Sequence, residues 1–152
     1  MSRVVNTKSN LSKLKTLVNE LTKRDEDIFS RKEVLQAIVE ASSDGLWDWN
    51  IQTNTAFLSV NYKKQLGYED HELANSPETW NRLMVPEDLK RMGELIEKHV
   101  ESNGEIPFKI VAHYKHKNGH LAKILCRGKV IEWDDEGNPI RMVGMHVDLT
   151  GL

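Results

Sequence analysis

The sequence predicts an α+β domain in which a five-stranded antiparallel sheet carries short helices over one face, preceded by a long amphipathic helix. Three observations predict this class. The first forty residues repeat apolar positions at helical spacing, the later segments alternate apolar and polar residues at strand spacing, and Gly, Asn and Pro separate these segments. The predicted order is helix, two strands, helices and three strands, which is compatible with a sheet covered on one face.

The composition limits the classes of function. The chain has 152 residues, a formal net charge of -2 and one cysteine, Cys126. A single thiol excludes an internal disulfide framework and a cysteine-rich zinc site, and it fits a reducing compartment. The near-neutral charge disfavours binding to nucleic acid, and no apolar run is long enough to span a membrane. We therefore expect a cytoplasmic module with no signal peptide and no membrane segment within these residues.

The first forty residues form the predicted long helix. Residues 8–40 contain no Gly, Pro or Trp, and they carry apolar residues at spacings of three, four and seven: Leu11, Leu14, Val18, Leu21, Ile28 and Leu35. Asp25 and Lys32 interrupt this stripe, and polar residues at such positions help to fix register and oligomeric state. The stripe either packs on the chain's own domain or forms a coiled coil with a second copy. The heptad spacing favours the coiled coil, and hence a homodimer.

Two strands and several helices follow the turn at residues 42–45. Residues 46–51 alternate, with Trp47 and Trp49 on one face, and a turn at residues 52–54 leads into a second strand at residues 56–60. Pro and acidic residues open the longest helix of this part, and an Asn-Gly pair ends it. The predicted helices cover residues 62–66, helical turns within 71–83, and the segment from Pro86 to Asn103.

The rest of the chain is predicted to form an antiparallel meander. Asn118-Gly119 is the strongest short hairpin turn in the sequence, and a polar turn at residues 134–139 separates the last two strands. Gly128 predicts a kink within the middle strand. The three strands cover residues 108–114, 121–133 and 140–149.

Several short segments occur in an order and at a spacing typical of one family. They are GLWDWN at 45–50, LGY at 66–68, Trp80, PEDL at 86–89, KNG at 117–119, RGKV at 127–130, DEGNP at 135–139, MVG at 142–144 and DLT at 148–150. Each segment is common alone, but the ordered set is specific. Through it the chain resembles a PAS domain, with PAC-type C-terminal strands, of bacterial sensory proteins. Val85 and Lys123 depart from this pattern, since the family usually has His at the first position and often Trp at the second.

The resemblance implies a sensory or dimerisation module of a signal-transduction protein, and no enzymatic activity in this chain. It implies a PAS domain over residues 42–150 after a helix over residues 1–41. Residues 151–152 would then begin a linker to a covalently attached effector, such as a diguanylate cyclase or a histidine kinase. Asp148 and Thr150 match the segment through which such proteins relay a signal into that linker. Their side-chain oxygens can also cap a following helix, or form an ordinary turn.

A ligand cavity between the sheet and its helices is the second implication. Large apolar residues at these positions either fill an ordinary core or enclose a small molecule, and the sequence leaves both interpretations open. The candidates that face inward are Trp49, Leu58, Tyr62, Leu66, Trp80, Met92, Ile96, Phe108, Ile110 and Met145.

Few residues are candidates for a cofactor or a metal. His99 falls on the apolar side of its predicted helix, where haem-binding PAS sensors carry an iron-ligating histidine, but a structural role is the commoner one. Flavin adduct chemistry needs a cysteine in an Asn-Cys-Arg helix, whereas Cys126 lies on a predicted strand. His113, His116 and His120 surround a hairpin turn and are expected to be solvated rather than zinc ligands. We expect no metal, no haem and no resident cofactor. The sequence leaves open whether the domain binds an unknown small molecule.

No catalytic residue is predicted. The sequence shows neither a nucleophile, base and orienting group at catalytic spacing nor a glycine-rich phosphate loop. Three hypotheses follow. The favoured one is a PAS sensory module that dimerises through its N-terminal helix and a face of its sheet. The alternatives are a haem-bearing sensor that uses His99 and a dimerisation adaptor without a ligand.

Overall fold

The computed structural model of the chain describes residues 10–20 and 31–151, which fall into two compact units, Met1–Ser42 and Ser43–Leu152. In the first unit, residues 10–20 are helical and helix α2 spans Arg31–Ala41. The predicted stripe residues Leu21 and Ile28 lie outside the described residues. In the described segments, no helix has the length and apolar character needed to cross a bilayer. Four stripe residues each expose more than half of their surface: Leu11, Leu14, Val18 and Leu35.

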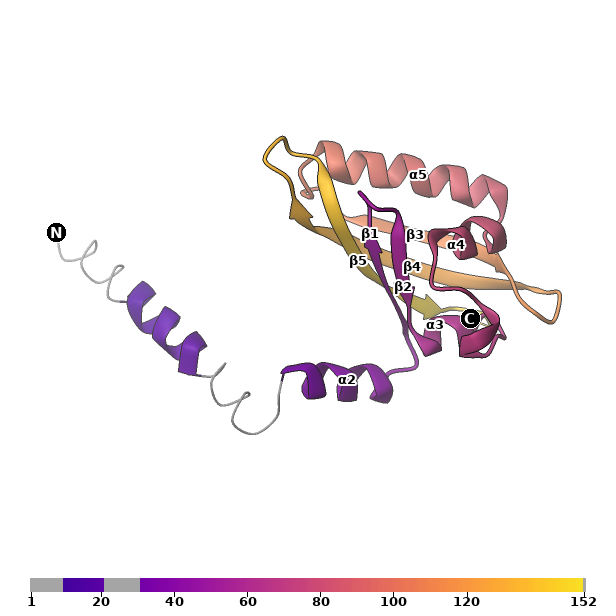
Figure 1. Ribbon diagram of the computed structural model, residues 1–152, viewed down its shortest axis with the longest axis horizontal. Helices are drawn as coiled ribbons and strands as arrows, with labels where there is room; N and C mark the ends of the chain where they lie inside the picture. Colours follow the sequence, from indigo (N-terminus) through magenta and orange to yellow (C-terminus); the bar gives the residue numbers. More distant parts are fainter. Residues whose placement is uncertain (1–9, 21–30, 152) are drawn as a thin grey trace. The chain divides into compact units, whose positions relative to one another are not determined.

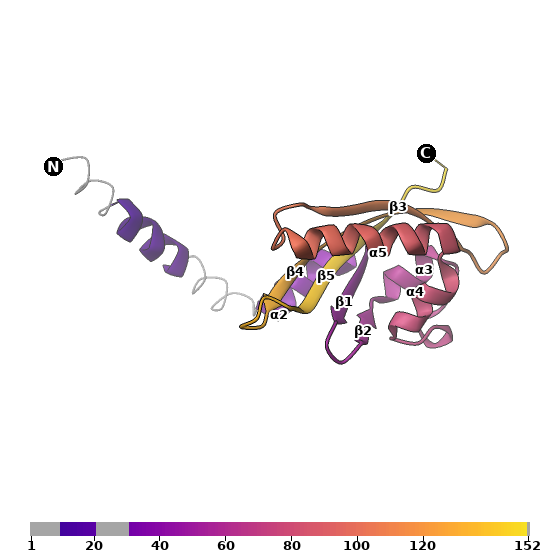
Figure 2. The same ribbon diagram turned by 90° about the horizontal axis from the view of Figure 1, so that it is seen from above.

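The second unit contains a five-stranded antiparallel sheet in the order β2-β1-β5-β4-β3. Its helices lie over one face of this sheet, and α5 runs along it (Figure 1 and Figure 2). The predicted α+β class, with five antiparallel strands and helices on one face, is confirmed. In chain order the elements are β1 (Gly45–Asn50), β2 (Thr55–Leu58), α3 (Val60–Gln65), the 3-10 helix η1 (Asp70–Glu72), α4 (Pro77–Leu83), α5 (Pro86–Glu101), β3 (Phe108–Lys115), β4 (Leu121–Trp133) and β5 (Pro139–Asp148).

The core lies between the sheet and the helices, where alternate residues of each strand point inward. On β3 the buried residues are Phe108, Ile110, Ala112 and Tyr114, as the alternation of the sequence predicts. The hairpin from β3 to β4 turns at Gly119, which has a positive φ of 93°. Glycine suits this position because it has no Cβ to clash in the left-handed region.

Two glycines explain how the centre of the sheet accommodates Trp47. Gly144 on β5 pairs with Trp47 on β1, and Gly128 on β4 pairs with Gly144. A Cβ at either glycine would collide with the Trp47 indole, so the ring lies directly against the backbones of both strands. The predicted kink at Gly128 is wrong, because the irregular pairing of β4 begins only after Val130. Close approach of an aromatic ring is the reason for glycine there.

The prediction that Met145 faces inward is also wrong. Met145 is 41% exposed on the outer face of the sheet, whereas Met142 and His146 are buried. The alternation of β5 therefore directs residues 142, 144 and 146 inward. The outward positions include Val143 and Val147 while Met142 points inward, so apolar residues occur on both faces of this strand and do not by themselves identify its inner face.

We expect Gly144→Ala to lower the free energy of unfolding by about 2–3 kcal/mol, because the added methyl group overpacks the Trp47 indole and the Arg127 carbonyl oxygen. Gly93→Ala is the matched control, since a Cβ at this helical position on α5 meets no other atom. That change should raise the free energy of unfolding by about 0.5–1 kcal/mol through helix propensity. Urea unfolding of both variants measures the difference, and similar effects of the two changes would contradict this packing.

Candidate functional site

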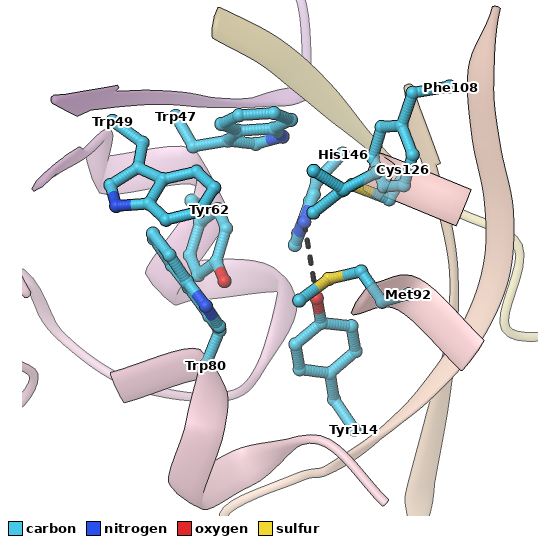
Figure 3. A pocket seen from close by; sticks show the side chains of 10 residues that line it. Trp47, Trp49, Tyr62, Trp80, Met92, Phe108, Tyr114, Cys126 and His146 are labelled. Atoms are coloured by element: carbon cyan, nitrogen blue, oxygen red, sulfur yellow. Dashed lines mark hydrogen bonds between the residues drawn. The ribbon is translucent and has the colours of Figure 1, made fainter. Parts of the chain in front are cut away.

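A small cavity lies between the inner face of the sheet and the covering helices (Figure 3). Its volume is about 20 Å³, which is room for roughly one water molecule. Strands β1, β3, β4 and β5 and helices α3, α4 and α5 all contribute to its wall. The lining residues are Trp47, Trp49, Tyr62, Trp80, Met92, Ile96, Phe108, Tyr114, Cys126 and His146.

Part of this lining corresponds to the residues expected from sequence. The predicted residues that line the cavity are Trp49, Tyr62, Trp80, Met92, Ile96 and Phe108. Leu58, Leu66 and Ile110 are buried in the core beside it, and Met145 lies on the opposite face of the sheet. Whether the cavity holds a molecule stays a prediction.

Four lining residues were not anticipated. Trp47 and Tyr114 share strand faces with Trp49 and Phe108, so strict alternation could have identified both. Cys126 and His146 are different, because they pair with each other across β4 and β5. Finding these two requires the register between strands, which no local pattern contains.

Local contacts place Tyr62 against His146. The Ser59 hydroxyl oxygen accepts the backbone N–H of Tyr62 at 3.3 Å and that of Leu46 at 2.8 Å, which ties the first turn of α3 to β1. Gly45 pairs with His146, and a Cβ there would lie 2.6 Å from the Tyr62 Cα. Glycine therefore lets α3 approach the sheet. The Tyr62 ring then stacks on His146, with centroids 4.1 Å apart and planes at 25°.

Several polar atoms at the cavity lack partners. The Tyr114 hydroxyl and His146 Nε2 share a hydrogen bond of 3.3 Å. Within the described residues, the Tyr62 hydroxyl, Trp47 Nε1 and His146 Nδ1 are buried without one. The Tyr114 hydroxyl is near enough to Tyr62 to lower the pKa of Tyr62, and Trp47 Nε1 is near enough to the Cys126 thiol to lower the pKa of Cys126, but neither pair has hydrogen-bond geometry. An unpaired buried polar group costs about 1–3 kcal/mol, so these atoms favour a bound partner.

Burial keeps the titratable groups of the cavity uncharged. Desolvation lowers the pKa of His146 from 6.5 to about 3 and raises the pKa of Cys126 from 9.0 to about 12. It also holds the pKa values of Tyr62 and Tyr114 well above the usual range. All four groups are therefore neutral near pH 7, and the lining contains no Asp, Glu, Lys or Arg. The described wall offers no counter-charge to an ion.

His99 does not fit the role of a haem ligand. It lies near the end of α5 with 1% exposure, and its Nε2 accepts the backbone N–H of Val130 at 3.1 Å. Its Nδ1 then carries the proton and donates to the Ile106 carbonyl oxygen at 2.7 Å. Coordination to iron would break one of these bonds and leave a buried backbone group unpaired. His99 instead connects α5 to β4 and to the loop before β3.

The other histidines have separate partners. His113 donates its backbone N–H to an Asp88 carboxylate oxygen at 2.8 Å, and its Nδ1 lies 3.0 Å from the same oxygen. His116 and His120 stack with centroids 4.1 Å apart near the hairpin turn. Across the described ranges, no three His, Cys, Asp or Glu side chains form a group that could hold a metal ion.

Residues 149–150, which follow β5, are hydrogen-bonded to β4. The Lys123 carbonyl oxygen accepts the N–H of Leu149 at 2.7 Å, and the Lys123 N–H donates to the Thr150 hydroxyl at 3.0 Å. Asp148 accepts the N–H of Thr150 at 2.9 Å. Asp148 and Thr150 thus fix the path by which the chain leaves β5, and their role in signal relay stays a prediction.

The fold agrees with the comparisons. The chain belongs to the PAS fold family, whose model matches residues 55–146. A sensory box histidine kinase/response regulator from Burkholderia thailandensis is 34% identical, with a TM-score of 0.64, over 76% of this chain and 84% of that one. The resemblance seen in the sequence is thereby confirmed.

Two further solved structures share the fold. The N-terminal domain of a diguanylate cyclase with PAS/PAC sensor from Marinobacter aquaeolei is 23% identical, with a TM-score of 0.58, over 70% of this chain and 95% of that one. A PAS domain from Colwellia psychrerythraea is 20% identical, with a TM-score of 0.58, over 77% of this chain and 98% of that one. No curated protein matches the chain.

We expect the domain to lose stability as the pH falls from about 6.5 towards 3. In the unfolded chain His146 binds a proton at its ordinary pKa of 6.5, whereas the buried ring binds one only near 3. The unfolded state therefore takes up more protons in this range, and this residue contributes a loss of up to about 1.4 kcal/mol per pH unit. His146→Phe keeps an aromatic ring at this position but removes the titratable group. It should therefore flatten the dependence of the free energy of unfolding on pH, as measured by urea unfolding between neutral pH and about pH 4. The exposed His120→Gln is the control, and identical slopes in all three proteins would refute the assignment.

Proposed function

We propose that this chain is the PAS sensory and dimerisation module of a bacterial, cytoplasmic signal-transduction protein, and that a small molecule in the cavity sets its signalling state. The observation that carries this proposal is a largely apolar cavity whose buried polar atoms lack partners. Membership of the PAS family and the histidine kinase relative support the signalling role. The chain itself is non-catalytic in this proposal. The effector, a diguanylate cyclase or a histidine kinase, belongs to the full-length protein.

A chain of hydrogen bonds supports a route from the cavity to both ends of the domain. The side-chain amide of Gln65 donates to the carbonyl oxygen of His146 at 2.9 Å and to that of Ser43 at 3.1 Å. Ser43 follows the end of α2 by two residues, and His146 precedes Asp148 by two. A shift of the His146 backbone would thus reach the N-terminal helix and the C-terminal segment together. We propose that the signal leaves through these segments.

Exposed apolar residues support the dimer. On the outer face of the sheet, Phe57 is 55%, Ile131 49% and Met145 41% exposed. Leu14 and Leu35 of the helical stripe are exposed as well. Apolar surface of this kind favours a protein partner, and heptad spacing is complementary to a second copy of itself. We therefore propose a homodimer formed by the N-terminal helices together with the outer sheet face.

Native mass spectrometry of the purified chain tests the ligand. We expect a non-covalent adduct that disappears on denaturation. The Cys126→Leu variant should lack it, because the larger side chain occupies part of the cavity. A clean apo mass, together with an unchanged thermal midpoint across a set of neutral small molecules, would instead support the adaptor without a ligand.

Sedimentation velocity tests the dimer. We expect the double variant Leu14→Asp, Leu35→Asp to shift the chain towards the monomer, because two charges in an apolar seam cannot be solvated. Lys13→Asp is the control, since Lys13 lies in the same helical segment as Leu14, residues 10–20, but outside the apolar stripe. Retention of the dimer in the double variant would exclude the helical seam as the interface.

A further inference from the structure

The wall of the cavity excludes one broad class of ligand. Six aromatic side chains line it, together with Met92, Ile96, Cys126 and the neutral His146. An ionised carboxylate, phosphate or ammonium group transferred to this wall would lose its hydration without gaining a salt bridge. Such transfers are among the most unfavourable in proteins. A ligand that fits is therefore uncharged, and most of its surface is apolar.

The unpaired polar atoms define what else the ligand carries. Of the three unpaired atoms, Trp47 Nε1–H is a donor only and the Tyr62 hydroxyl also has a proton to donate, whereas the role of His146 Nδ1 depends on the tautomer of the ring. Both donors are buried, and in Figure 3 the Tyr62 hydroxyl points into the space among the labelled side chains. Neither donor has an acceptor in hydrogen-bond geometry, although the Tyr114 hydroxyl lies near Tyr62 and the Cys126 thiol lies near Trp47. The oxygen atom of a water molecule or of a ligand, which has free lone pairs, satisfies such donors better. An apolar molecule without such an atom would leave them unpaired.

The side of the wall formed by α5 is less buried than the side that carries Tyr62. Tyr62, Tyr114 and His146 are almost completely buried, whereas Met92 and Ile96 on α5 are only partly buried. A cavity that admits benzene has a volume of about 150 Å³, so a ring enters here only if side chains move. Met92 is suited to this because its unbranched thioether has three rotatable bonds. The oxygen of the ligand would lie deep, near Tyr62, with its apolar body against Met92.

From these observations we infer that the cavity takes an uncharged organic molecule with an apolar body and one oxygen acceptor, the class of small phenols, ketones and alcohols. The inference rests on the proposed function, since it names the ligand class of the same cavity. The Tyr62 hydroxyl is the group that recognises the oxygen. An aromatic cation held by the paired rings of Trp49 and Trp80, whose centroids are 5.7 Å apart, is the competing class.

Isothermal titration calorimetry with four probes at neutral pH tests the inference. The probes are 4-methylphenol, toluene, 4-methylbenzoate and benzylammonium, which have similar rings and differ in the polar group. We expect 4-methylphenol to bind several-fold to about tenfold more tightly than toluene, the value of one net hydrogen bond. The two ions should show no measurable binding.

Tyr62→Phe removes only the hydroxyl and should reduce the affinity for 4-methylphenol to that for toluene, with toluene binding unchanged. Loss of an unpaired buried hydroxyl is not expected to destabilise the fold, and the thermal midpoint checks this. Tyr68→Phe is the control, because Tyr68 does not line the cavity, and it should keep the wild-type ranking.

The outcomes separate this inference from the proposed function. Equal affinities for 4-methylphenol and toluene in both Tyr62 forms would overturn the role of the oxygen acceptor and leave a ligand-binding cavity. Tightest binding of benzylammonium or 4-methylbenzoate would overturn the uncharged class in the same way. Absence of binding by all four probes would overturn both the inference and the proposed sensing of a small molecule.

Discussion

The arrangement of this domain depends on one close contact, the Trp47 indole against the backbones of Gly128 and Gly144. Because neither glycine has a side chain, a large ring can lie directly against the centre of the sheet. Phe108 then meets Trp47 edge-to-face, with centroids 6.5 Å apart, and the helices cover the remaining inner surface. Gly45, at the start of β1, acts in the same way: because it has no side chain, Tyr62 on α3 can approach the strand closely. The three glycines, Gly45, Gly128 and Gly144, thus determine where the cavity and its aromatic wall lie.

The cavity combines two properties that oppose each other energetically. Aromatic burial stabilises the fold, whereas each unpaired polar atom within the same wall destabilises it by about 1–3 kcal/mol. A core selected for stability alone would have Phe in place of Tyr62 and an apolar residue in place of His146. Neutral, poorly satisfied groups in an otherwise apolar wall are consistent with a binding site. The bond from Gln65 to the His146 carbonyl connects that wall to the point where the chain enters the domain.

Much of the fold could be predicted because its signals are local. Asn118-Gly119 marks a hairpin by itself, and the alternation from Phe108 to Tyr114 identifies an inner face without further information. The errors arise where a local pattern is misleading. The inward positions of β5 hold Met142, Gly144 and His146, whereas Val143, Met145 and Val147 point outward, so apolar character alone predicts the wrong face for Met145. The sequence predicts a kink at Gly128 because the contact of this glycine with Trp47 depends on strands far apart in sequence and leaves no local signal.

The central claim is that an occupant of the cavity changes the ends of the domain. An NMR titration of backbone and side-chain amides with 4-methylphenol tests it most directly. The account predicts shifts at Tyr62 and His146, at the Gln65 side-chain amide, and at Ser43 and Thr150; in a Gln65→Leu variant the shift at Ser43 should be lost while those at the cavity remain. Shifts confined to surface residues, or shifts at Ser43 that survive in the variant, would contradict the account.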